Sequence, residues 1–142
     1  MQLSQIIRTW RVFGIASMVT EFFGGIWAGT AFVGQRMVIP YTAAPVPNAA
    51  LANDFTLTIT DGAAIVFGVP LNPPPAANYV QRITILIVNA SGGAHGAITW
   101  NAIYHTAATP FPAVANGSNR QIAFVWSGTA WLQESYAADV AN

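Results

Sequence analysis

The sequence of 142 residues contains no cysteine and no lysine, and only 7% of its residues are charged. The absence of cysteine excludes disulfides, thiolate metal sites and cysteine nucleophiles. A typical soluble domain carries about 25% charged residues, so this chain has too few charges to solvate the surface of an ordinary monomer. We therefore expect much of its surface to be covered by a partner.

An excess of positive charge is also missing, because five basic residues balance five acidic ones. Nucleic acids and anionic membranes attract clustered basic side chains, so neither is predicted as a partner. A hydrophobic content of 54% excludes disorder, because disordered chains have a low hydrophobic content. The length fits one domain.

A long apolar run lies near the N-terminus, where Glu21 is the only ionisable residue between Val12 and Gly34. The run is long enough to span a bilayer, but a carboxylate near its middle costs about 2.5 to 3.5 kcal/mol. Thr20 and Glu21 also interrupt the unbroken run that a signal peptide needs. The sequence therefore predicts neither a membrane span nor a leader.

We interpret residues 1–41 as an apolar arm that docks and oligomerises, residues 42–53 as a Pro/Ala linker, and residues 54–142 as a β-sandwich domain. The arm carries large apolar side chains that we expect to bind a partner: Ile6, Trp10, Phe13, Phe22, Phe23 and Trp27. Helical spacing and β-branched content leave both a helical and an extended arm open. Such a surface favours a homo-oligomer, because monomers rarely expose large apolar patches.

After the linker, residues 55–60 alternate apolar and hydroxyl side chains, which is typical of a half-buried strand. Asp61-Gly62 then predicts a turn into a second strand at 64–69, so these two strands are expected to form a hairpin. The β-branched run 82–89 predicts a central strand. Residues 121–126 and 130–134 flank Ser127-Gly128 as the clearest hairpin.

Shorter strands are expected at residues 36–41, 97–100 and 103–105, the first ending at Pro40 as an edge strand. About seven short strands with turns every 8 to 12 residues predict an all-β fold. The expected architecture is a β-sandwich or jelly-roll-like domain of antiparallel strands.

The chain offers few groups for chemistry: Glu21, Asp54, Asp61, Glu134, Asp139, His95 and His105. No nucleophile elbow, dinucleotide fingerprint or phosphate loop joins them. The two histidines lack the further ligands that zinc requires, and Asp54 and Asp61 are better explained as a strand start and a turn residue. We predict no catalytic residue, no metal and no cofactor, and hence a protein that is not an enzyme.

The stretch RITILIVNASGGAHGAITWNAIYH, followed by RQIAFVWSGTAWLQE, resembles a small β-sandwich domain of tailed-bacteriophage virion proteins, matched over about residues 55–142. The shared pattern has a turn after an Arg-Ile-x-Ile strand, a Thr-aromatic pair, a Tyr and a Gly-Thr-x-Trp hairpin. The matching positions are Arg82, Asn89, Ser91, Gly92, Gly93, Thr99, Trp100, Tyr104, Gly128, Thr129 and Trp131. The chain departs from the pattern at Val125-Trp126-Ser127 and at His105.

The resemblance implies a structural component of the phage particle, assembled in the host bacterial cytoplasm and found on head decorations, head fibres and tail fibres. Short length favours a capsid decoration or cement protein, with the major capsid protein and further copies of the chain as its partners. The resemblance implies a trimer of these copies. The alternatives are a tail-fibre or spike domain that contacts the host surface, and a carbohydrate-binding module.

A carbohydrate-binding module would use Trp100, Trp126 and Trp131 as exposed stacking platforms. Strand alternation places most of these indoles on apolar faces, so core packing is favoured over sugar stacking.

Overall fold

The computed structural model describes residues 35–75, 78–107, 111–137 and 139–141. These residues belong to one compact unit, Val33–Asn142. Within them the backbone forms strands, turns and loops, and no helix. The predicted all-β class is therefore confirmed for the described part of the chain.

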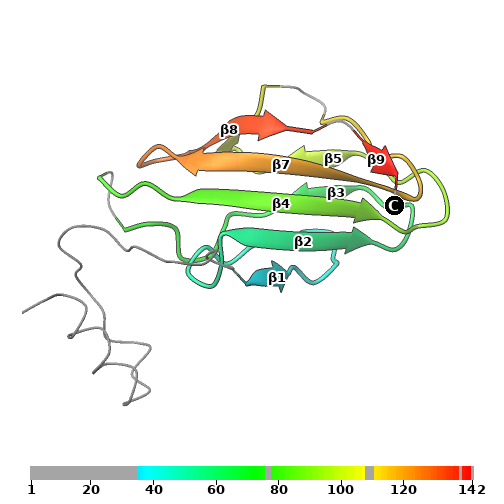
Figure 1. Cartoon of the computed structure of the whole chain (residues 1–142), viewed down its shortest axis with the longest axis horizontal. Coiled ribbons are helices and arrows are strands. Elements are labelled where there is room, and N and C mark those ends of the chain that lie inside the picture. Colours follow the sequence, from blue (N-terminus) through cyan, green and yellow to red (C-terminus); the bar gives the residue numbers. More distant parts are fainter. Residues whose placement is uncertain (1–34, 76–77, 108–110, 138, 142) are drawn as a thin grey trace, which may run out of the picture. The chain divides into compact units, whose positions relative to one another are not determined.

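A seven-stranded sheet forms one layer of this unit (Figure 1). Its strands lie in the order β1, β2, β4, β7, β8, β6, and β9 pairs with the start of β7. The bounds are β1 Arg36–Val38, β2 Asp54–Ile59, β4 Arg82–Asn89, β6 Tyr104–His105, β7 Ser118–Trp126, β8 Trp131–Tyr136 and β9 Val140–Ala141. The central place predicted for residues 82–89 is confirmed, because β4 lies between β2 and β7.

The inner face of this sheet follows directly from alternation along β2, β4 and β7. Every second side chain of these strands is buried, and the large apolar ones are Phe55, Leu57, Ile59, Ile83, Ile85, Ile87, Ile122, Phe124 and Trp126. Burying each such side chain is worth roughly 1.5 to 3 kcal/mol, and a one-residue slip would turn the whole set outward. Hydrophobic burial therefore fixes the register of the three strands.

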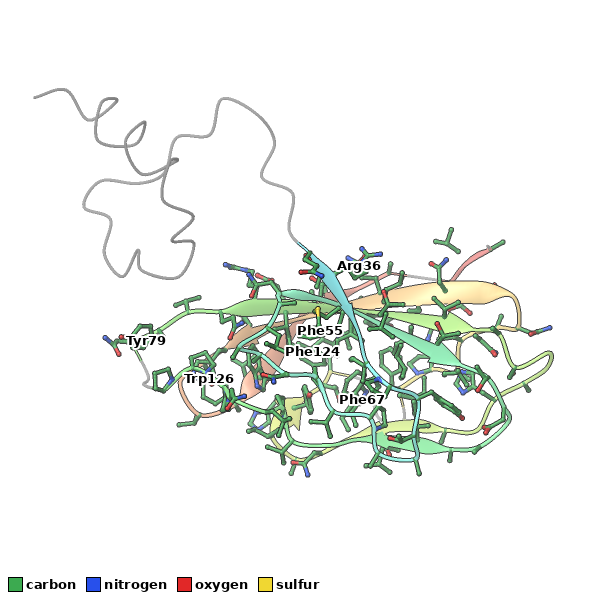
Figure 2. All side chains as sticks on the ribbon, turned by 90° about the horizontal axis from the view of Figure 1, so that it is seen from below. Arg36, Phe55, Phe67, Tyr79, Phe124 and Trp126 are labelled. Carbon is green, nitrogen blue, oxygen red and sulfur yellow. The ribbon has the colours of Figure 1, made fainter. Side chains whose placement is uncertain are left out.

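The second layer is built around β3 (Ile65–Phe67), which pairs in parallel with β5 (Ile98–Trp100). Residues 43–45 extend this layer, since Val66 N donates to Ala43 O at 2.9 Å and Gly68 N donates to Pro45 O at 3.0 Å. Figure 2 shows the core between the layers, with Phe55 and Phe124 on the large sheet above Phe67. The two layers together make the sandwich-like arrangement that the sequence predicts.

The hairpin predicted for residues 55–60 and 64–69 is wrong. β2 and β3 lie in different sheets, and β2 pairs in parallel with β1 and with β4. The Asp61-Gly62 turn carries the chain from one layer to the other, and the chain then returns to the large sheet as β4. Strand pairing is consequently mixed and not antiparallel throughout, although the β7–β8 hairpin around Gly128 is confirmed.

Residues 42–53, which the composition predicts to be a linker, are part of the compact unit, which begins at Val33. Pro45, Pro47 and Ala49 are buried. Proline lacks an amide hydrogen but keeps its carbonyl, and here Pro47 O accepts from Leu71 N at 2.9 Å. The segment therefore joins the second layer through its acceptors, a role that its proline content does not reveal.

Candidate functional site

The six side chains predicted to bind a partner lie outside the described residues. They are Ile6, Trp10, Phe13, Phe22, Phe23 and Trp27. Their assignment stays a prediction, and so does the choice between a helical and an extended arm. Glu21 also lies outside the described part of the chain.

The acidic residues of the described part are spread over the unit and do not converge. Asp54 begins β2, whereas Asp61 follows the end of that strand. Asp61 accepts hydrogen bonds from the Tyr41 hydroxyl and from Ala63 N, and these bonds lower the pKa of Asp61 below its ordinary value. The same contact raises the pKa of Tyr41. Asp61 thus stabilises a turn, as the sequence suggested.

The two histidines differ in their surroundings. His105 is exposed on β6, whereas His95 is buried. The Nε2 atom of His95 accepts a hydrogen bond from Val114 N at 2.8 Å, and its Nδ1 lies 2.5 Å from Gly96 O. Because Val114 N donates to Nε2, Nδ1 is the ring nitrogen placed to donate, and it faces Gly96 O. His95 fastens the loop before β7 to the loop before β5, a structural role that sequence analysis missed.

An ion pair between buried Arg120 and half-buried Asp139 joins β7 to the C-terminal part of the unit. The Arg120 guanidinium lies 2.7 Å from Asp139 Oδ1 and donates to Pro112 O at 2.6 Å. Asp139 Oδ2 in turn accepts from Ala115 N at 2.8 Å. These bonds fix the loop at residues 112–115 between the two charged groups. The sequence gives no signal for this pair, because its members are separated by a turn and a strand.

Aromatic side chains fill the space between the layers. Trp100 stacks on Phe67 with ring centroids 4.2 Å apart, and its edge meets Tyr104 and Phe124. Trp126 and Trp131 form a second pair at 5.2 Å. Trp131 has 0% of its surface exposed and Trp126 has 7%, so neither ring is a platform for a sugar. The predicted core packing is confirmed for Trp126 and Trp131, whereas Trp100 is partly buried and packs against the core.

The turn after β4 is built on Asn89, which is fully buried. Its Nδ2 donates to Gly93 O and to Val114 O, and its Oδ1 accepts from the backbone and the hydroxyl of Ser91. Gly92 adopts a φ of 79°, which side chains disfavour, whereas Gly93 does not take positive φ. The Asn-x-Ser-Gly-Gly residues of the resemblance therefore form one hydrogen-bonded turn.

Exposed apolar side chains gather on two loops that hydrogen-bond to each other. Ala49 N donates to Leu71 O at 2.9 Å, and Asn72 Nδ2 donates to Asn48 Oδ1 at 3.0 Å. The two loops carry the exposed residues Leu51, Val69, Leu71, Tyr79 and Val80. Figure 2 places Tyr79 at one end of the unit.

Among the described residues no group of three or more histidine or acidic side chains is placed to hold a metal ion. No helix in this part of the chain is long and apolar enough to cross a membrane. No protein-family model matches the chain, and no curated protein matches it.

Proposed function

We propose that this chain is a non-enzymatic structural protein of a tailed-bacteriophage particle. The observation that carries the proposal is the placement of the residues behind the resemblance. Asn89, Ser91 and Gly92 build one turn, and Gly128, with a φ of 102°, closes the β7–β8 hairpin. Trp100 and Tyr104 meet in the core. The matching positions therefore fall on framework elements of a two-layer β domain.

The most specific form of the proposal is a capsid decoration protein that binds the head lattice through its N-terminal arm. Two features support it. The charged content of 7% is low for a free soluble surface, and the arm concentrates aromatic residues in a segment with few charges. A docked arm would cover this apolar surface and leave the β domain outside.

Virions purified from the phage whose genome encodes this sequence provide the test. Quantitative mass spectrometry should find the protein in them at a stoichiometry comparable to that of the major capsid protein. A few copies per particle would instead indicate a tail-fibre or spike component. Absence from purified particles would contradict the proposal as a whole.

A second test addresses the arm itself. A full-length variant with Trp10, Phe13, Phe22 and Phe23 replaced by serine should lose binding to particles that lack the protein. A matched control replaces Val66 and Val80, which are exposed on the β unit, by serine. Equal occupancy of the arm variant and the control would show that the arm is not the anchor.

A further inference from the structure

The large sheet has an outer face that turns away from β3 and β5. Its central side chains are Thr56, Thr58, Thr84, Leu86, Val88, Gln121, Ala123 and Val125. Gln121 is exposed and the others are half-buried, whereas their inward neighbours on the same strands are buried, so the described residues leave this face uncovered. The centre is uncharged, because none of these side chains is ionisable, and most of them are β-branched.

Charged side chains line one end of this outer face. Arg36 on β1 lies opposite Asp54 on β2, and both point outward because their neighbours Met37 and Phe55 face the core. Figure 2 shows Arg36 on the side of the sheet opposite Phe67. Arg82 begins β4, which runs parallel to β2. These three charges therefore lie near the same end of three adjacent strands.

Glu134 adds a fourth charge to the row. Its carboxylate oxygens both lie 3.1 Å from Arg82 Nε, so the side chain reaches from β8 across β7 towards β4. The signs across this end of the sheet then read plus, minus, plus, minus, from Arg36 through Asp54 and Arg82 to Glu134. We call these residues the charge row.

An alternating row with an even number of charges is complementary to itself. A two-fold axis that runs along the strands, between β2 and β4, reverses the order of the row in a second copy. Arg36 then lies over β7 of the second copy, which the Glu134 side chain crosses to reach Arg82. Asp54 lies over β4 of the second copy, two residues along the strand from its Arg82. The same axis places the threonines of β2 over Leu86 and Val88 of the other copy, because Thr56 is level with Leu86 and Thr58 with Val88.

We propose that the outer face binds the same face of a second copy of this chain, through a two-fold contact of sheet on sheet. Two-fold contacts between identical patches are the commonest form of oligomer. Stacked sheets pack about 10 Å apart with strands aligned within roughly 30°. The contact buries the uncharged centre and adds an opposite charge to each member of the row.

The charge row argues against other occupants of this face. A partner with one sign of charge would meet two like charges, and like-charge contacts are costly. A purely apolar partner would desolvate the row without supplying opposite charges. A second copy carries charges of both signs and supplies an opposite charge to each member of the row. The proposal does not depend on a role in a virion, and it uses none of the six arm side chains predicted to bind a partner.

The test uses full-length protein and exploits the absence of cysteine, which makes any introduced thiol unique. The Thr84→Cys variant carries its thiol on the outer face, whereas Val66→Cys carries it on β3 of the other layer, at a position that is 50% exposed. A short bismaleimide should link Thr84→Cys chains into covalent dimers at micromolar protein. Val66→Cys chains should give only the background yield. Equal yields at the two positions would overturn the proposal.

A charge-reversal series identifies the contact. Asp54→Arg or Arg82→Asp, each in the Thr84→Cys background, places like charges across the interface and should lower the dimer yield at least tenfold, since about 1.4 kcal/mol corresponds to a factor of ten. A mixture of the two variants again sets opposite charges against each other and should recover the yield. Val66→Arg, on β3 of the other layer, serves as the control, with circular dichroism to verify folding. A dimer yield that Asp54→Arg leaves unchanged, or a mixture in which the dimer yield does not recover, would refute the contact.

Discussion

Asn89 is buried, and its side-chain amide donates and accepts hydrogen bonds at once. The bonds reach Gly93 O at 3.1 Å and Val114 O at 2.9 Å, so one residue joins the turn after β4 to the loop before β7. A buried carbonyl left without its donor loses more than the net value of the bond, because it also stays desolvated. A single amide therefore controls two segments.

Replacing Asn89 by alanine should lower the free energy of unfolding by about 2 to 4 kcal/mol, since several buried polar groups lose their partners together. Urea unfolding followed by circular dichroism measures the change. Asn116, which is exposed in the next loop, is the matched control, and Asn116→Ala should stay within about 0.5 kcal/mol of the wild type. Equal effects at the two positions would contradict this account of the turn.

Tyr41 and Asp61 give the unit a pH-dependent contact. The hydrogen bond lowers the pKa of Asp61 below its ordinary value of 3.8, so the contact favours folding while the carboxylate is ionised. This contribution is present above the ordinary carboxyl range and is lost as the pH falls through the lowered pKa. The sign follows because the unfolded chain binds the proton more readily than the folded one.

Tyr41→Phe should therefore raise the pKa of Asp61 towards its ordinary value, and the residual lowering should come from Ala63 N. Carbon-detected NMR titration of the side-chain carboxyl measures this directly. The difference in stability between wild type and variant should shrink as the solution is acidified. A pKa of Asp61 that is identical in both proteins would rule out the contact.

At the scale of elements, β3 and the loop before β5 approach each other closely at Gly96. A Cβ built on Gly96 would lie 2.5 Å from Ala64 N, which is backbone and has no freedom to move aside. Gly93, only three residues earlier, has nothing within 4 Å of the corresponding position. The packing of the second layer therefore requires the absence of a side chain at Gly96 but not at Gly93.

Gly96→Ala should destabilise the unit by about 1 to 3 kcal/mol, the usual cost of forcing an extra carbon into a packed site. Gly93→Ala should be nearly neutral, because neither space nor backbone conformation opposes the methyl group. Thermal unfolding of both variants separates the two cases. A neutral Gly96→Ala would mean that Ala64 is not held at this distance in solution.

The elements also show how far the sequence could lead. The alternation in residues 55–60 correctly predicts β2 and its buried face, because side-chain period depends only on the strand itself. The alternation does not predict which strands lie beside β2. The Asp61-Gly62 turn predicts a change of chain direction, but not the layer in which the next strand lies. The β7–β8 hairpin was predictable because its partners are joined by residues 127–130 alone.

Sites built from several strands were beyond reach for the same reason. Arg36, Asp54, Arg82 and Glu134 look like isolated charges in the sequence, and they form a row only once the order β1, β2, β4, β7, β8 is known. The pair Arg120 and Asp139 likewise requires the position of the last strand. Single strands encode their faces, whereas charge patterns across a sheet depend on topology.

For the whole molecule, the concentration of apolar residues in the N-terminal arm predicts self-association of the free protein. Monomers rarely expose more than a few hundred Å² of contiguous apolar surface. Replacing Trp10 and Phe13, or Phe22 and Trp27, by serine should shift the mass measured by light scattering towards smaller species. The thermal transition of the β unit should not move. A stable wild-type monomer at tens of micromolar would contradict the prediction.

The parallel pairing of β1 with β2, β2 with β4, β3 with β5 and β6 with β8 has a consequence for folding kinetics. Each of these ladders joins residues far apart in the chain. The entropy of loop closure is therefore lost before the contacts stabilise the folded chain. Chains dominated by such non-local pairing fold in milliseconds to seconds. During that interval the strands of the large sheet expose both edges and apolar faces. We therefore expect a comparatively long aggregation-prone stage, during which chaperones that hold the chain would raise the yield of folded protein.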